Sequence, residues 1–203
     1  MTRPTYIALK IIVWLACLWP LCWLIWRAAT NNLGADPTAT ITFATGLATL
    51  RILTISLAIT PLRRLSPHLG WLIRFRRLLG LFAFFYASLH LLTYIALYAG
   101  FDVNAMAADI AKRRYITMGV AAWLLLLPLA ATSTNWAIRK LGGARWRNIH
   151  KLAYAAAVCG VIHYWWQVKP GVRTPLTITI VLAVLLIARP IQEWMQRSKA
   201  QMA

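Results

Sequence analysis

The sequence predicts an all-α, polytopic membrane protein, built as a bundle of six transmembrane helices. Three observations lead to this prediction. Of the 203 residues, 61% are hydrophobic. Only 13% are charged, against about 25% in a typical soluble domain. The apolar residues also come in blocks of about 20, which is the length of helix that crosses a bilayer core about 30 Å thick.

The six apolar blocks are the predicted spans. They cover approximately residues 6–26, 41–62, 78–99, 115–134, 148–166 and 174–192. Each is expected to be a helix, because the blocks lack the alternation of barrel strands and a backbone in lipid must satisfy its own hydrogen bonds. Turn-forming residues separate the blocks at 31–37, 66–67, 142–143 and 170–171. We expect one transmembrane domain over residues 1–203, with the first block retained and not cleaved as a signal peptide.

Lys and Arg predict the orientation. With the N-terminus inside, fourteen fall on inner segments: Arg3, Lys10, Arg63, Arg64, Arg74, Arg76, Arg77, Arg139, Lys140, Arg145, Arg147, Arg189, Arg197 and Lys199. Six fall on outer segments: Arg27, Lys112, Arg113, Arg114, Lys169 and Arg173. Both termini are therefore expected in the cytoplasm. This topology explains the net charge of +18, so membrane lipid is an expected partner and nucleic acid is not.

Two intramembrane histidines are the strongest candidates for chemistry, because polar groups in a bilayer are costly. His90 lies about 12 residues into the third span and His163 about 15 residues into the fifth, or roughly 18 and 22 Å at 1.5 Å per residue. Both spans run outward, so the two imidazoles are expected at one depth in the outer half. Such a pair suits the two axial positions of a haem iron, which makes His90 and His163 predicted iron ligands. The alternative for either is a hydrogen bond between helices.

A second, inner site is suggested by His150, a further candidate iron ligand near the cytoplasmic end of the fifth span. On one ideal helix, His150 and His163 would point about 140° apart, and a bulge or over-wound turn near Cys159–Gly160 would be needed to bring them to one face. Arg76 occupies the position on the third span where an inner histidine would be expected. It is a candidate for binding haem propionates or a flavin phosphate.

Arg51 lies in the middle of the second span, about 15 Å from either end. At this depth the guanidinium of Arg51 cannot easily reach the membrane surface, and a haem propionate is its expected partner. The basic inner loops expected at 63–77 and 135–147 follow the positive-inside rule, and they also suit docking of a flavin phosphate or an acidic electron donor. No hydrolytic triad, P-loop or carboxylate pair occurs, and no catalytic residue is expected. Cys17, Cys22 and Cys159 are interpreted as small apolar residues.

Short motifs along nearly the whole chain carry a family resemblance. They are Leu33-Gly34-Ala35-Asp36-Pro37, Ile59-Thr60-Pro61-Leu62, Arg76-Arg77-Leu78-Leu79-Gly80-Leu81, Ser88-Leu89-His90, Thr132-Ser133-Thr134, Ile149-His150-Lys151-Leu152-Ala153-Tyr154 and Ile162-His163-Tyr164-Trp165. With these motifs the sequence resembles the haem-binding membrane subunits of bacterial methionine sulfoxide reductase systems, which belong to the ferric-reductase-like transmembrane superfamily.

The resemblance implies one or two b-type haems on His90, His163 and His150, together with FMN. It implies a cytoplasmic flavin reductase or the quinone pool as electron donor, and a periplasmic molybdopterin catalytic subunit as acceptor. The expected function is electron transfer across the bacterial inner membrane for repair of oxidised proteins. Three alternatives stay open: a histidine-relay proton channel or transporter, a structural anchor for a periplasmic enzyme, and a stand-alone ferric reductase.

Overall fold

A computed structural model describes residues 2–168 and 174–202. Within these ranges the chain is helical and contains no strand. The elements in order are α1 (Arg3–Ala29), α2 (Pro37–Leu65), η1 (Pro67–Leu72), α3 (Ile73–Thr93), η2 (Tyr94–Tyr98), α4 (Val103–Lys112), α5 (Arg114–Ala131), α6 (Asn135–Leu141), α7 (Gly143–Ile149), α8 (Leu152–Gln167) and α9 (Thr174–Met202). The turn predicted at 170–171 and the charges of Lys169 and Arg173 lie outside the described residues.

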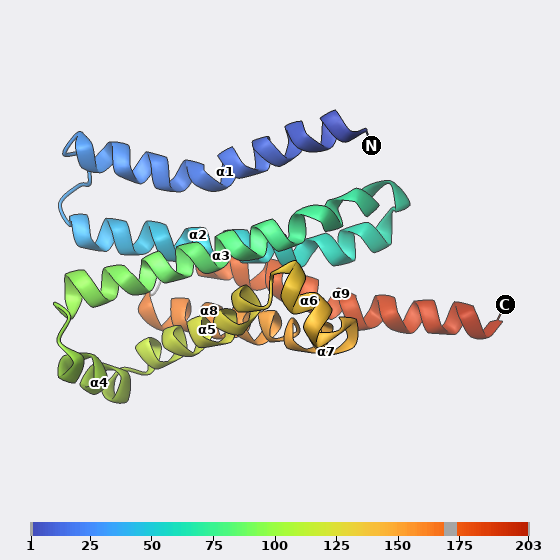
Figure 1. Ribbon diagram of the computed structural model, residues 1–203. Helices are drawn as coiled ribbons and strands as arrows, with labels where there is room; N and C mark the ends of the chain where they lie inside the picture. Colours follow the sequence, from blue (N-terminus) through green and yellow to red (C-terminus); the bar gives the residue numbers. More distant parts are fainter. Residues whose placement is uncertain (1, 169–173, 203) are drawn as a thin grey trace.

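The long helices form an antiparallel bundle. Figure 1 shows α1, α2, α3, α5, α8 and α9 running side by side, with both termini at one end and α4 at the other. The most extensive contacts join α2 to α3 and α5 to α8. Less extensive contacts between α3 and α5 and between α2 and α8 join these two helix pairs. The bundle is therefore built from two tightly packed pairs.

The predicted membrane character agrees with this architecture. Five helical segments are long and apolar enough to cross a bilayer: 3–29, 37–65, 68–98, 114–131 and 174–192. Helix α8 has 16 residues, or about 24 Å at 1.5 Å per residue, and is shorter than a typical span. The count of six spans therefore stays a prediction, although α8 lies beside the other long helices in Figure 1.

The structure differs from the sequence-based interpretation in one inner loop and in the fifth span. The segment 135–147 was expected to be a loop, yet it contains α6 and most of α7. Thr134 caps α6 by accepting a hydrogen bond from Ala137 N, and Gly142 ends it at φ 74°. The bulge near Cys159–Gly160 is also absent, because α8 is α-helical from Leu152 to Gln167. The chain instead turns at His150, between α7 and α8.

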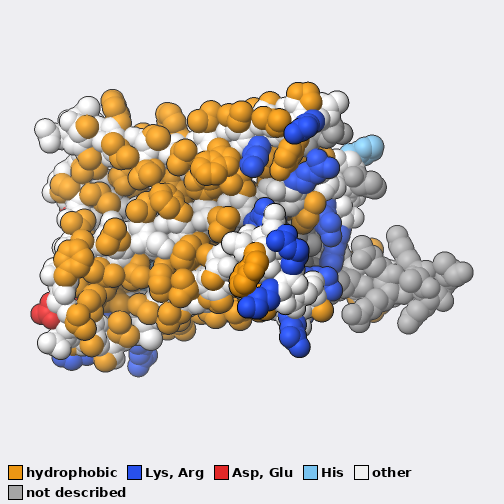
Figure 2. All heavy atoms as spheres, in the orientation of Figure 1, with side chains coloured by type: hydrophobic (Ala, Val, Ile, Leu, Met, Phe, Trp, Pro, Cys, Tyr) orange, Lys and Arg blue, Asp and Glu red, His pale blue; other side chains and the backbone are white. Residues whose placement is uncertain are grey.

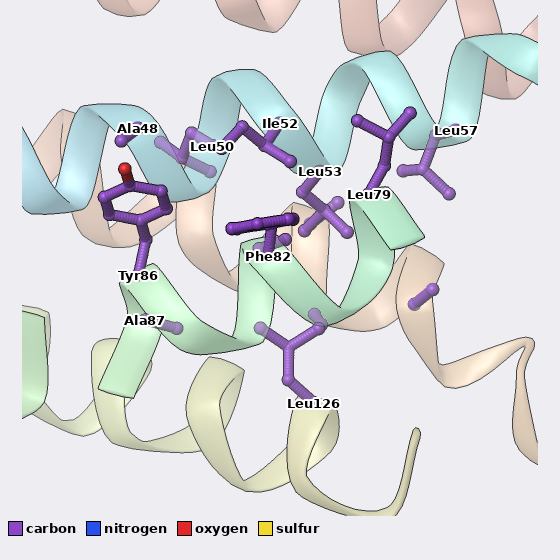
Figure 3. Packing of buried hydrophobic residues seen from close by; sticks show 14 of the residues in the cluster. Ala48, Leu50, Ile52, Leu53, Leu57, Leu79, Phe82, Tyr86, Ala87 and Leu126 are labelled. Atoms are coloured by element: carbon purple, nitrogen blue, oxygen red, sulfur yellow. The ribbon is translucent and has the colours of Figure 1, made fainter. Parts of the chain in front are cut away.

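Small residues allow the helices to approach closely, which is how helices pack where lipid removes the hydrophobic driving force between them. Ala83 on α3 and Ala156 and Ala157 on α8 are almost fully buried. Larger side chains fill the space around them: Phe82 and Tyr86 of α3 pack against α1, and Figure 3 shows Leu126 of α5 reaching toward α3. These interfaces hold the backbones of α2, α3, α5 and α8 at fixed distances around the site described below.

The surface divides into an apolar middle and polar ends. Every long helix exposes large apolar side chains, among them Trp19, Ile55, Leu92, Leu124 and Val184. In Figure 2 such side chains cover the middle of the visible face, and Lys and Arg gather at the end where α6 and α7 lie. The apolar middle is expected to face lipid and the basic end to lie on the cytoplasmic side, which is the pattern that the sequence predicts.

Candidate functional site

His90 on α3 and His163 on α8 face one another inside the bundle. Their ring centroids are 5.8 Å apart and the ring planes make an angle of 80°. The two rings therefore lie together, as their shared depth predicted, and their role as iron ligands stays a prediction. Both side chains are partly buried, and they come from different helix pairs, so the contacts of α3 with α5 and of α2 with α8 set their separation.

Each imidazole is held through Nδ1 by a backbone carbonyl. His90 Nδ1 lies 2.9 Å from the carbonyl oxygen of Thr42 on α2, and His163 Nδ1 lies 2.6 Å from that of Tyr115 on α5. A carbonyl only accepts, so Nδ1 must carry the proton in both rings. In a neutral imidazole the Nε2 lone pair is then available, and a carbonyl that accepts from Nδ1–H is the usual support of an iron- or zinc-binding histidine.

A glycine lies beside each ring, one helical turn after the carbonyl that holds it. A Cβ added at Gly46 would lie 3.0 Å from His90 Cε1. One added at Gly119 would lie 2.9 Å from His163 Nδ1. Gly46 follows Thr42 by four residues and Gly119 follows Tyr115 by four. The two helix pairs therefore build the same local arrangement, a carbonyl and a glycine on one helix that together seat a histidine of the next.

Both histidines line one cavity of ≈ 560 Å³ between α2, α3, α5 and α8. This volume is within the range of about 300–1,000 Å³ for pockets that bind small molecules and cofactors. Its walls are largely apolar and include Leu50, Leu53 and Leu126. A cavity with two available imidazole nitrogens and apolar walls suits a flat, largely apolar group that contains a metal.

The mouth of the cavity is polar and is formed by η2, α4 and the start of α5. The Tyr94 hydroxyl donates to Asp109 Oδ2 over 3.1 Å, and Arg113 Nε lies 3.1 Å from Asp109 Oδ1. Arg113 also donates through Nη1 to the Tyr115 hydroxyl over 3.3 Å. This hydrogen bond and the nearby Asp109 carboxylate raise the pKa of Arg113, so its positive charge is permanent. The sequence showed Arg113 only as one of six outer charges.

His150 occupies a different environment at the inner end. Its ring stacks on Trp146 with centroids 3.9 Å apart, and its Nε2 lies 3.2 Å from Thr132 Oγ1. The Thr132 hydroxyl donates its proton to the Pro128 carbonyl, so it accepts from His150 Nε2–H. Nδ1 is then the lone-pair nitrogen of His150. This orientation is the reverse of that in His90 and His163.

Arg76 lies close enough to His150 for its charge to act on the imidazole. Its Nη1 donates to Thr60 Oγ1 over 3.3 Å. Among the side chains that the structure describes, no carboxylate pairs with Arg76. Neither Arg76 nor His150 lines the cavity of His90 and His163, and their role in a second site stays a prediction.

Arg51 does not reach the cavity. It points outward from α2, its side chain is exposed, and it is absent from the residues that form the cavity wall. The sequence predicts the position of Arg51 along α2, but the direction of its side chain depends on which face of α2 packs against α3. The buried face carries Leu50, Leu53 and Leu57, which turns the neighbouring Arg51 away.

The fold and the paired imidazoles define a helical, multi-pass membrane protein of the ferric-reductase-like transmembrane class. Residues 45–161, more than half of the chain, match the family described as "Ferric reductase like transmembrane component". This segment includes Gly46, His90, Gly119 and His150, and it ends two residues before His163.

Relatives refine this class. A protein of Herminiimonas arsenicoxydans is 46% identical over 97% of this chain and 90% of its own length. One of Rhodospirillum rubrum is 50% identical over 89% of this chain and 86% of its own. One of Ralstonia nicotianae is 46% identical over 92% and 85%. Each is named "Protein-methionine-sulfoxide reductase heme-binding subunit MsrQ". The chain belongs to the MsrQ family.

Proposed function

We propose that this protein binds a b-type haem between His90 and His163 and carries electrons across the bacterial inner membrane. The observation that carries the proposal is the imidazole pair, whose Nδ1 atoms are both held by carbonyls and whose rings lie 5.8 Å apart in one cavity. Relatives named as heme-binding subunits support the same cofactor. A haem held there supplies one-electron transfer within the bilayer.

The residues around the cavity have separate tasks in this proposal. His90 and His163 present Nε2 to the iron, and Thr42 and Tyr115 hold the rings in the required tautomer. Apolar side chains such as Leu50 and Leu126 exclude water from the cavity wall. The histidines come from α3 and α8, two elements of a packed bundle, so little rearrangement accompanies a change of charge at the site.

We propose that electrons enter at the basic end from a cytoplasmic flavin reductase or from quinone. They leave at the opposite end to a periplasmic molybdopterin subunit that reduces methionine sulfoxide in damaged proteins. The Lys and Arg gathered at the α6–α7 end support cytoplasmic termini. His150 and Arg76 lie at this end and are the proposed site for a second haem or for FMN, where Arg76 supplies a charge for propionate or phosphate.

The experiment is a comparison of purified variants by visible spectroscopy and by chemical determination of haem. Wild type is expected to show a b-type Soret and α band, and His90→Ala and His163→Ala are expected to lose haem or its low-spin spectrum. His68→Ala is the matched control, because His68 is exposed in η1 and does not line the cavity. Wild-type protein without any b-type absorbance contradicts the proposal and favours a histidine relay for protons.

A further inference from the structure

The cavity around His90 and His163 is polar at one end only. Helices α2 and α5 run away from the α4 end of the bundle (Figure 1), so Leu53 and Leu126 line its deep end and are apolar. The mouth is lined by Tyr94, Asp109 and Arg113. This polarity matches a flat ligand whose charged groups lie on one edge and whose other edges are apolar.

Among the described residues that line this mouth, Arg113 is the cation, and its neighbours hold it in place. Asp109 Oδ1 binds its Nε at 3.1 Å, and the Tyr115 hydroxyl accepts from its Nη1 at 3.3 Å. A guanidinium has five N–H donors, and among the described residues these contacts use two of them. The remaining donors, on Nη1 and Nη2, can form a charge-assisted pair with a carboxylate.

The negative charge of Asp109 does not prevent Arg113 from pairing with a carboxylate of a ligand. One carboxylate oxygen of Asp109 accepts from Tyr94 and the other from Arg113. Asp109 is thus engaged by its neighbours and serves to orient Arg113.

Tyr115 joins this mouth to the imidazole pair. Its hydroxyl accepts from Arg113, and its backbone carbonyl accepts from His163 Nδ1. One residue at the start of α5 therefore sets both the direction of the guanidinium and the orientation of a proposed iron ligand. A flat ligand that contains a metal would be held at its charged edge by Arg113 and at its central metal by His163.

We propose that Arg113 binds the carboxylate edge of the cofactor, so that the propionates of the haem face the α4–α5 end and the deep end takes its apolar edge. This inference rests on the proposed haem function. It gives to Arg113 the task that the depth of Arg51 had suggested for that residue, and it makes Arg113 a positioning residue with no part in iron ligation.

The experiment compares two probes in apoprotein: protohaem, which has two free propionates, and its dimethyl ester, which has none. Wild type is expected to bind protohaem about three- to tenfold more tightly than the ester, because a partly exposed ion pair is screened by solvent. In Arg113→Ala this ratio is expected to approach one, while the low-spin spectrum from His90 and His163 is kept. Arg114→Ala is the matched control, because Arg114 is the adjacent exposed cation and does not line the cavity.

A second variant, Arg113→Lys, keeps the charge and is expected to retain most of the preference. The inference is overturned if Arg113→Ala discriminates between the probes as wild type does, or if wild type binds both equally well. Either result leaves the His90–His163 haem standing. Failure of wild type to bind protohaem at all overturns the proposed function itself, so the two failures can be told apart.

Discussion

His90 and His163 lie with their ring centroids 5.8 Å apart and their planes at 80°, although they come from helices α3 and α8 that belong to different packed pairs. In each pair the neighbouring helix supplies a carbonyl to Nδ1 and, one turn later, a glycine beside the ring. The repetition of this arrangement around two histidines accounts for their alignment better than the position of either histidine alone.

Substitution of the glycines tests this arrangement. In Gly119→Ala the new Cβ would lie 2.9 Å from His163 Nδ1, and in Gly46→Ala 3.0 Å from His90 Cε1. Each change must push a ring away from its carbonyl, and we expect haem content to fall about tenfold at limiting haem, as for a loss of about 1.4 kcal/mol of binding free energy. Haem content per protein is the measurement.

Gly80→Ala is the control for both, because a Cβ at Gly80 meets nothing within 4 Å. Alanine also has the higher helix propensity, so this variant should be at least as stable as wild type and keep its haem. Normal haem content in Gly119→Ala and Gly46→Ala would show that close contact with glycine does not position the rings.

Tyr86 tests how α1 is attached to the bundle. Its buried hydroxyl donates to the Cys17 carbonyl over 2.7 Å and accepts from Leu21 N over 3.1 Å, beside Pro20, which lies inside α1. These two backbone groups are spaced to bond to each other in a regular helix, and a side chain inserted beside a proline is a known cause of helix bending.

Tyr86→Phe removes the hydroxyl and with it both hydrogen bonds to the backbone of α1, at a cost of about 1–3 kcal/mol. We expect a lower midpoint of thermal denaturation in detergent, followed by circular dichroism. Tyr6→Phe provides the comparison, since no hydrogen bond of the Tyr6 hydroxyl occurs among the described residues. Equal midpoints for the two variants would mean that the bridge to α1 contributes nothing measurable to stability.

His150 tests whether the inner and outer sites are separate. It does not line the cavity, and its Nε2 is engaged by Thr132. His150→Ala is therefore expected to keep the low-spin spectrum of the outer pair, whether or not it loses a second haem. Loss of all haem in His150→Ala would contradict the assignment of His90 and His163 to a self-sufficient site, and haem stoichiometry with spectra decides the question.

Much of the bundle could be predicted because hydropathy blocks and helix geometry are local properties. The lengths of the apolar runs gave α1, α2, α5 and the start of α9, and the rise per residue placed His90 and His163 at one depth. The basic end followed from counting Lys and Arg. None of these inferences required knowledge of which helices touch.

Features that depend on contacts between helices could not be predicted. The direction of Arg51 follows from which face of α2 packs on α3. The turn at His150 replaced a continuous span, because the residues before it form α7 and pack with α6. The π-helical segment η2 after His90, which places Tyr94 at the mouth, has no distinctive sequence, and the tasks of Gly46 and Gly119 appear only when the histidine of the next helix is in place.

Restoration by free imidazole tests the central claim most directly. His163→Gly removes the ring and leaves space for a free imidazole to take its position against the Tyr115 carbonyl. The account predicts that the variant loses the low-spin, two-imidazole spectrum and regains it when imidazole is added, whereas His68→Gly is unaffected throughout. A wild-type spectrum in His163→Gly without imidazole, or no recovery at saturating imidazole, would contradict axial ligation by His163.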